Sequence, residues 1–382
     1  MKIYKNYSLK KHNTFGINAT AAAFVEIHST KELKAVLENN KLPIFLLGGG
    51  SNVLLTKDFY DCLFIKNSIL GIKIVENVNS ETKIAKNQKN TEGSFDVGLG
   101  ISEVANTILK LEKIHQKLLT EYNFNKIIEV GGGESWHDVV LWAIKNDLGG
   151  IENLSLIPGT IGAAPIQNIG AYGVELKNVF HKLEAFNVQT FENQMFTLED
   201  CQFGYRDSIF KNALKGQYLI TKVFLKLTPP PYHTLNMEYG DIQKMLAANN
   251  ITKPTLKDIS DAVIAIRQSK LPDPAVLGNA GSFFKNPEIP LAQFNDLKAK
   301  FPSIVGYPTA RETVKVAAGW LIETADWKGK RFGAIGVHER QALVLVNYGG
   351  GKGLEIKDLA QKIQASILKM FEIELMAEVN WL

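Results

Sequence analysis

The sequence predicts an α+β protein built from two or three domains. Its 382 residues exceed what one hydrophobic core usually holds. Short apolar runs typical of strands are mixed with amphipathic segments typical of helices, and no internal repeat recurs at a fixed period. Apolar residues make up 45% and charged residues 21% of the chain, which is the composition of an ordinary globular protein.

Composition and charge exclude several classes of protein. No apolar run approaches the roughly 18 residues that a membrane helix needs, and the N-terminus lacks the apolar segment of a signal peptide. We therefore expect a soluble, cytoplasmic protein with no membrane partner. A net charge of +4 is too small to indicate nucleic acid. Cys62 and Cys201 lie far apart, and the seven histidines show no ligand spacing, so we predict neither a disulfide nor a metal site.

The first predicted unit covers residues 1–70. Strand-like runs occur at 21–28 (AAAFVEIH), 43–55 (PIFLLGGGSNVLL) and 62–66 (CLFIK), and a helical segment, KELKAVLENN, fills 31–40. This pattern is typical of a small α/β unit.

The second predicted unit covers residues 71–232. It is mostly strand-like, with one clear helix that begins after Ser135 and is expected to stop at Gly149. Three prolines at 229–231 end its last strand. The polar stretch 76–93 is predicted to be an exposed insertion.

The third predicted unit covers residues 259–382. We expect a linker around 232–258, a helix at 258–270 (DISDAVIAIRQSK), and a pair of strands at 332–338 (FGAIGVH) and 342–347 (ALVLVN).

The segment LGGGSNVLL (47–55) is the first candidate for a binding motif. Three consecutive glycines let backbone N–H groups converge on an anion without obstruction by side chains. The segment lacks the GK[ST] of a P-loop and the helix that follows a GxGxxG fingerprint. A phosphate cradle and a tight hairpin both remain open.

The loop at 149–176 is the second candidate. Six glycines, two prolines and almost no charge describe an extended path of small residues, against which a large flat ligand could lie. A structural loop of this length is uncommon in a compact domain, so binding is favoured over a purely structural role.

Two further segments carry polar candidates. CQFGYRDSIFK (201–211) places Arg206 beside Asp207, which on its own indicates only a surface ion pair. The segment 267–287 carries Arg267, Lys270, Ser282 and Lys285 on a non-helical path that suits a phosphate or carboxylate substrate. The GxSxG elbow is absent, so a nucleophilic serine is not favoured.

Taken together and in order, these motifs resemble the bacterial UDP-N-acetylenolpyruvoylglucosamine reductases (UDP-N-acetylmuramate dehydrogenases, MurB). The resemblance runs almost end to end, and the stretches MEYGDI and KLPDP suggest the larger subtype. The segments that carry it are NTFGI (13–17), GGGSNVLL, the 149–176 loop, YRDSIFK, KLPDP, GNAGSFFKNP (278–287), AAGWLIE (317–323) and AEVNWL.

The resemblance implies a fold and a reaction. It implies a two-part FAD-binding region of the PCMH/vanillyl-alcohol-oxidase type (1–70 and 71–232), and a C-terminal α+β substrate-binding domain (259–382) whose last strand returns to the active site. Hydride would pass from NADPH to non-covalently bound FAD and then to UDP-N-acetylglucosamine enolpyruvate, giving UDP-N-acetylmuramate for peptidoglycan synthesis. The expected partners are these two small molecules, and the expected oligomeric state is a monomer.

The resemblance also assigns residues. Ser282 corresponds to the proton donor of the family, and Arg206 and Glu378 to its two other catalytic residues. The residues that match substrate contacts are Tyr239, Arg267, Lys270 and Asn286. The residues expected to contact FAD are Gly48, Gly49, Gly50, Ser51, Asn52, Pro158, Gly159, Gly162, Gln167, Asn168, Ala171 and Tyr172.

Two alternatives are weighed against this reductase. Another oxidoreductase of the same fold would need neither a diphosphate grip nor Ser282, and a non-catalytic flavin- or nucleotide-binding module would tolerate loss of the acid–base residues. The segments 76–93 and 117–126 are longer than the family pattern, and no function is assigned to them. The sequence leaves open the preference for NADPH over NADH and the protonation state of Glu378.

Overall fold

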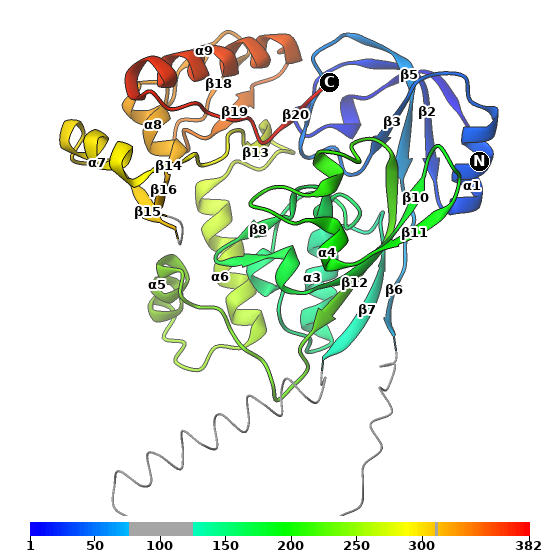
Figure 1. Ribbon diagram of the computed structural model, residues 1–382, viewed down its shortest axis with the longest axis horizontal. Coiled ribbons are helices and arrows are strands. Elements are labelled where there is room, and N and C mark those ends of the chain that lie inside the picture. Colours follow the sequence, from blue (N-terminus) through cyan, green and yellow to red (C-terminus); the bar gives the residue numbers. More distant parts are fainter. Residues whose placement is uncertain (76–124, 310–311) are drawn as a thin grey trace, which may run out of the picture.

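The computed structural model describes residues 1–75, 125–309 and 312–382, which form two large sheets and a C-terminal body of smaller sheets and helices (Figure 1). Within these residues, no helix is both long and apolar enough to span a membrane. The predicted insertions at 76–93 and 117–126 lie outside the described residues, apart from the last two positions of the second.

The N-terminal sheet has the strand order β1-β2-β5-β3. Strands β2 and β3 both run parallel to β5, and α1 connects β2 to β3. The elements are β1 (Tyr4–Ser8), η1 (Lys10–His12), β2 (Thr20–Ile27), α1 (Thr30–Asn39), β3 (Ile44–Leu47), β4 (Val53–Leu54) and β5 (Phe59–Asn67). The predicted strands and helix are therefore confirmed.

The second sheet is antiparallel throughout, with the order β11-β10-β12-β7-β6. Its strands are β6 (Ile72–Val75), β7 (Lys126–Gly131), β10 (Phe180–Asn187), β11 (Asn193–Phe196) and β12 (Tyr218–Leu227). Sheet membership changes between Asn67 and Ile72. The domain limits at 70, 232 and 259 stay predictions.

Helix α3 (Trp136–Lys145) begins as predicted and ends earlier than predicted. The Ser135 hydroxyl accepts a hydrogen bond from the Asp138 N–H, which caps the helix. The predicted stop at Gly149 is wrong. Asp147 takes the left-handed conformation (φ 55°), its N–H bonds to the Ile144 carbonyl, and the Leu148 N–H bonds to the Ala143 carbonyl. This is the paired bonding that usually involves glycine.

Short elements fill the segments between the strands of the second sheet. The predicted loop at 149–176 contains η2 (Glu152–Leu154), η3 (Ala164–Gln167), β8 (Gly170–Ala171) and β9 (Val174–Glu175). They are followed by η4 (Leu176–Asn178), α4 (Leu198–Cys201) and η5 (Ile209–Lys211).

The predicted linker at 232–258 is wrong in one respect, because it contains α5 (Gly240–Ala248). This helix packs on α6 (Leu256–Lys270) through a small apolar cluster that includes Ile242, Leu246, Ile259 and Val263. The buried stripe of α5 consists of only two residues, so its helical period in the sequence is short and easily missed.

In the described residues, the C-terminal body has two sheets, of orders β13-β19-β18-β17 and β14-β16-β15, and three helices. The predicted strand pair appears as the antiparallel strands β18 and β19. The elements are β13 (Gly278–Ser282), β14 (Glu288–Pro290), α7 (Leu291–Lys300), β15 (Gly306–Pro308), β16 (Thr313–Val316), α8 (Ala318–Thr324), β17 (Arg331–Phe332), β18 (Ile335–Val337), β19 (Val344–Asn347) and α9 (Gly353–Phe371).

The C-terminal tail joins the two ends of the chain. Strand β20 (Asn380–Trp381) leaves the C-terminal body and pairs in parallel with β4, beside the glycine-rich turn (Figure 1). The N-terminal sheet shares one hydrophobic core with the C-terminal body and a smaller one with Phe186 and Leu219 of the second sheet, which also has a core of its own. The tail therefore reaches the place where the predicted binding motifs meet.

Candidate active site

Two adjoining cavities lie between the three parts of the molecule. The larger has a volume of about 550 Å³ and the smaller about 240 Å³. Both are lined by Ser51, Asn52, Pro158, Gln167 and Ile169. Because the two cavities adjoin along these shared residues, a single extended ligand can occupy both.

The glycine-rich turn forms part of the wall of the smaller cavity. Gly48, Gly49 and Gly50, with Ser51 and Asn52, all line it. A Cβ atom on Gly48 would lie 2.8 Å from the Thr160 hydroxyl oxygen, and one on Gly49 would lie 3.0 Å from the Gly159 Cα. The turn and the 158–160 segment approach each other closely because these positions carry no side chain.

Replacing Gly50 with alanine should damage both stability and cofactor content. Gly50 has φ +68°, and its Cβ would lie 2.0 Å from the His12 carbonyl oxygen, so the turn would have to move. Gly16 has a similar φ of +65° with nothing near its Cβ position. Gly16→Ala should therefore lose only the strain of the left-handed conformation, about 1–2 kcal/mol.

Urea unfolding and the ratio of flavin to protein would test this. Gly50→Ala should lose more unfolding free energy than Gly16→Ala and should also lose flavin. Equal losses in the two variants would show that the contact with His12 does not constrain the turn.

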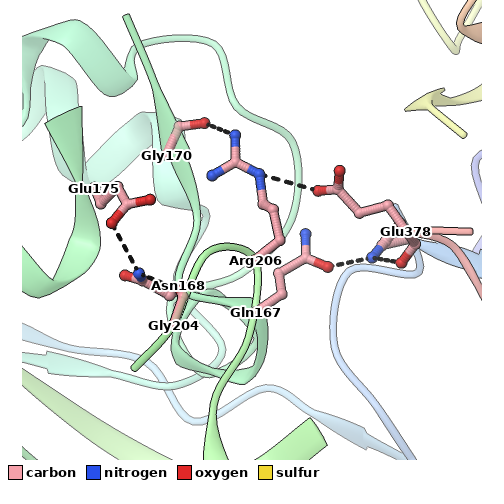
Figure 2. A network of polar contacts seen from close by, with 8 residues as sticks. Gln167, Asn168, Gly170, Glu175, Gly204, Arg206 and Glu378 are labelled. Carbon is pink, nitrogen blue, oxygen red and sulfur yellow. Dashed lines mark hydrogen bonds and ion pairs between the residues drawn. The ribbon is translucent and has the colours of Figure 1, made fainter. Parts of the chain in front are cut away.

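Arg206 and Glu378 contact each other on the wall of the larger cavity (Figure 2). Arg206 Nε lies 3.3 Å from Glu378 Oε1, and the two side chains are 19% and 15% exposed. Arg206 takes a left-handed backbone conformation (φ 53°), and its Nη2 donates to the Gly170 carbonyl. Two contacts on different segments thus fix the guanidinium plane before any substrate arrives.

Burial raises the pKa of the Glu378 carboxyl above its ordinary value, although Arg206, Lys211 and Lys285 pull it down. The net direction is upward because removal from water is the largest effect. Glu378 therefore ionises less readily than an exposed glutamate.

Ser282 lies at the end of β13, beside the tail that carries Glu378. The Glu378 N–H donates to the Phe283 carbonyl at 2.8 Å, and the Phe283 N–H donates to the Leu343 carbonyl at 2.7 Å. Ser282, Arg206 and Glu378 all line the larger cavity. The structure brings the three predicted catalytic residues together.

Asn279 holds the backbone that leads to Ser282. Its side-chain amide donates to the carbonyls of Pro272 and Leu277, and its oxygen accepts from the Gly281 N–H. This buried asparagine belongs to the GNAGSFFKNP motif, but the sequence did not predict a role for it. A buried asparagine beside glycines is the type of residue that forms such turns.

The residues of the 149–176 loop that were predicted to contact FAD divide into two groups. Pro158, Gly159 and Gln167 line the cavities, whereas Gly162, Asn168, Ala171 and Tyr172 do not. The side chain of Asn168 bonds to Glu175, the Gly204 carbonyl and the Lys177 N–H, so it holds the loop together (Figure 2). A cofactor contact by these four residues stays a prediction.

The four residues predicted to contact the substrate do not all line the larger cavity. Arg267 lines the larger cavity, and burial lowers its pKa. Lys270 forms an ion pair with Asp241 on α5. Tyr239 is 46% exposed and stacks edge-on against Tyr172, and the Asn286 side chain accepts from the Ala318 N–H. Among these four, only Arg267 borders the cavity.

His137 and Lys211 line the cavities and were not predicted. His137 Nδ1 accepts a hydrogen bond from the Leu156 N–H at 3.0 Å. Burial lowers the pKa of His137, and the charge on Arg267 lowers it further. The neutral ring therefore carries its proton on Nε2 and is a donor. Lys211 ends the YRDSIFK motif, where its position gives no sign of burial.

Comparison with known proteins agrees with this geometry. Residues 92–190 match the family described as FAD binding domain, and residues 273–382 match "UDP-N-acetylenolpyruvoylglucosamine reductase, C-terminal domain". A UDP-N-acetylenolpyruvoylglucosamine reductase from Flavobacterium johnsoniae is 47% identical over 381 residues, covering 100% of this chain and 99% of the relative. One from Amoebophilus asiaticus is 45% identical over 383 residues, with the same coverage.

A solved structure has the same fold. The crystal structure of UDP-N-acetylenolpyruvylglucosamine reductase from Thermus caldophilus has a TM-score of 0.62 and 19% identity, and the match covers 100% of this chain and 99% of that one.

The FAD-binding domain, the predicted α+β fold and the paired cavities together define an FAD-dependent oxidoreductase. More narrowly, the identity over the whole length of the curated relatives shows that the chain belongs to the family of UDP-N-acetylenolpyruvoylglucosamine reductases.

Proposed function

We propose that this protein uses NADPH and non-covalently bound FAD to reduce UDP-N-acetylglucosamine enolpyruvate to UDP-N-acetylmuramate, a precursor of peptidoglycan. The observation that carries this proposal is the convergence of Ser282, Arg206 and Glu378 in a cavity that adjoins the glycine-lined cavity. This set of residues suits the addition of hydride and a proton to an anionic alkene.

The residues around the smaller cavity fit FAD. The turn at Gly48–Asn52 and the segment at Pro158–Gly159 leave its walls without bulky side chains, and Lys211 adds a positive charge. Bound FAD would supply the redox chemistry by carrying two electrons from NADPH to the substrate. Flavin released by heat or acid into the supernatant would establish that the attachment is not covalent.

Ser282 is proposed to supply the proton. Hydride addition to the methylene carbon leaves negative charge at the neighbouring carbon and its carboxylate. A neutral hydroxyl can protonate that carbon without adding a charge that would repel the carboxylate. Ser282 Oγ would give up its proton at this step and recover one from solvent.

Arg206 is proposed to hold the substrate carboxylate as the charge develops. Its Nε contacts Glu378 and its Nη2 contacts the Gly170 carbonyl, so the guanidinium is already oriented. A donor fixed in advance stabilises developing charge without having to reorganise during the reaction.

Arg267, Lys270, Tyr239 and Asn286 are proposed substrate contacts. Arg267 Nε is buried without a hydrogen-bond partner among the described residues, and Arg267 lines the larger cavity. We place Lys270 and Tyr239 at the outer end of this path, where the UDP diphosphate would lie.

Lys270→Ala should raise the KM for the UDP-sugar with little change in kcat. The loss of one charge-assisted contact to a phosphate is worth about 1.5–3 kcal/mol, or roughly 10- to 100-fold in KM. Lys257 is a matched control, because it pairs with Asp261 on the exposed side of the same helix. Steady-state kinetics that give the same KM for both variants would remove Lys270 from the substrate site.

Stopped-flow spectroscopy would test the function. NADPH should bleach the yellow absorbance of the purified protein, and the enolpyruvyl UDP-sugar should restore it with a two-hydrogen gain in product mass. Restoration by oxygen alone would indicate a different oxidoreductase, and a colourless protein that takes up no FAD would reject the proposal. Running NADH in parallel would define the preference between the two nucleotides.

We further propose that the protein works as a cytoplasmic monomer, since each proposed catalytic residue comes from one chain and both substrates are small and water-soluble. Light scattering that gives the mass of a dimer, or fractionation that recovers the enzyme with membranes, would contradict this.

A further inference from the structure

Three residues that line the smaller cavity each carry a buried polar atom without a hydrogen-bond partner. In the part of the chain that the structure describes, seven buried side-chain nitrogen or oxygen atoms have no hydrogen-bond partner. Lys211 Nζ, Thr160 Oγ1 and Trp381 Nε1 are among them, and all three residues line this one cavity. Buried polar groups are rarely left unpaired in native proteins, so three around one cavity indicate a ligand group that pairs with them.

The ammonium of Lys211 needs a negative partner. The nearby carboxyl of Glu378 is already paired with Arg206. The nearby carboxyl of Asp207 accepts hydrogen bonds from the Ser208 N–H and the Asn212 amide. Lys285 adds a second positive charge, which together with burial lowers the pKa of Lys211. A buried ammonium with no counter-charge is strongly unfavourable, so an anion is the group that fits.

The other two atoms narrow the chemistry of this anion. The indole N–H of Trp381 can only donate, the Lys211 ammonium can only donate, and the Thr160 hydroxyl can do so. Three donors from separate segments require a group with several acceptor oxygens. The neighbouring Gly48–Gly50 turn provides the side-chain-free approach that phosphate groups need.

We propose that Lys211 Nζ, Thr160 Oγ1 and Trp381 Nε1 bind the diphosphate of FAD. This inference rests on the proposed function, in which FAD occupies the smaller cavity. The diphosphate is the only part of oxidised FAD that carries full negative charge, whereas its adenine and flavin rings are neutral.

Trp381 also links the proposed phosphate site to the tail that carries Glu378. Trp381 lies three residues after Glu378 on the tail, and Asn52 holds the tail between them. Its side chain donates to the Glu378 carbonyl at 3.2 Å, and its own carbonyl accepts from the Asn380 N–H at 3.0 Å. The cofactor diphosphate would thus hold the segment that carries Glu378.

Binding of FAD to the apoprotein, followed by quenching of flavin fluorescence, tests the assignment. Lys211→Met should weaken FAD binding by about 10- to 100-fold, the usual value of one charge-assisted hydrogen bond. Thr160→Val, which keeps the shape of the side chain, and Trp381→Phe, which keeps an aromatic ring but removes the N–H, should each weaken it by about 2- to 10-fold. Lys34→Met is the control and should bind FAD as wild type does, because Lys34 is exposed on α1 and lines neither cavity.

Competition by smaller ligands identifies the phosphate group. ADP, which carries the diphosphate without the flavin, should lose affinity for Lys211→Met by the same factor as FAD, while adenosine should bind both proteins equally. FAD binding by Lys211→Met equal to that of wild type would overturn the assignment. So would a change confined to the KM for NADPH or the UDP-sugar, because the anion would then belong to a substrate.

Two controls separate the possible failures. If Lys211→Met does not fold, Trp381→Phe and Lys211→Arg decide the question, with Arg expected to retain binding and Phe to lose part of it. A wild-type protein that takes up no FAD would reject the proposed function itself. Variants that match an FAD-binding wild type would reject only this inference.

Discussion

Ser282→Ala should leave the reduction of the bound flavin by NADPH unchanged and slow its reoxidation by the enolpyruvyl substrate by about 10³-fold, within the usual range for loss of a general acid or base. The physical reason is that, in the proposed mechanism, the serine proton is needed only when the substrate carbon becomes basic. The hydroxyl carries no charge, and the proposed reduction of the flavin by NADPH takes no proton from it. Single-turnover absorbance traces measure the two halves separately.

The control for this variant is Ser269→Ala. Ser269 lies two residues after Arg267, and its hydroxyl bonds to the Ile266 carbonyl within α6. This variant should match wild type in both halves. If Ser282→Ala slowed both half-reactions equally, Ser282 would be a residue that shapes the cavity rather than the proton donor. His137 would then be the next candidate for the donor.

Deuterated solvent gives an independent readout. Protonation by an exchangeable hydroxyl should place one deuterium from D₂O in the product at the carbon that bears the carboxylate. The residual turnover of Ser282→Ala should also incorporate deuterium, but without strict stereochemistry, since water would then approach from more than one direction.

The part of the fold that the sequence could predict is the part held by local signals. The Ser135 cap at the start of α3, the strand runs of both large sheets and the glycine turn all rest on residues close together in the chain. The predicted end of α3 was wrong because an aspartate, Asp147, takes the left-handed conformation that glycine usually adopts after a helix.

The part of the site that local sequence patterns could not predict depends on contacts between residues far apart in the chain. Strand β20 has two residues and pairs with β4, more than three hundred positions away, so no periodic pattern reveals it. Lys211 likewise reads as a solvent-exposed lysine after two apolar residues, and only the fold closes the cavity over it. Resemblance placed Ser282, Arg206 and Glu378, whereas geometry added Lys211, Trp381 and His137.

Glu378→Ala should lower kcat/KM for the enolpyruvyl substrate by about 10²- to 10³-fold, whereas Glu378→Gln should retain most activity below the pKa of Glu378. The carboxyl oxygen contacts Arg206 Nε at 3.3 Å, and a glutamine oxygen can accept the same bond. Alanine would remove that acceptor and open a space beside a buried guanidinium. The comparison separates loss of shape from loss of a titrating proton.

The kcat/KM of the wild-type protein should depend on pH through the titration of Glu378. Burial raises the pKa of Glu378, so the carboxyl stays protonated at pH values where an ordinary glutamate is ionised. As the pH rises through this raised pKa, the carboxylate that forms would repel the carboxylate of the substrate. The kcat/KM of wild type should therefore fall toward high pH, while that of Glu378→Gln should stay flat through the same range.

Folding stability should follow the same titration. A carboxyl whose pKa is raised in the folded state stabilises the protein fully below its ordinary pKa, and this contribution is lost as the pH rises through the folded value. Glu378→Gln should therefore gain stability relative to wild type as the pH increases, measured by urea unfolding at several pH values. If Glu378→Gln is as inactive as Glu378→Ala at every pH, then the ionised carboxylate is the working form, and its task is to hold Arg206 by charge rather than to remain neutral beside the substrate.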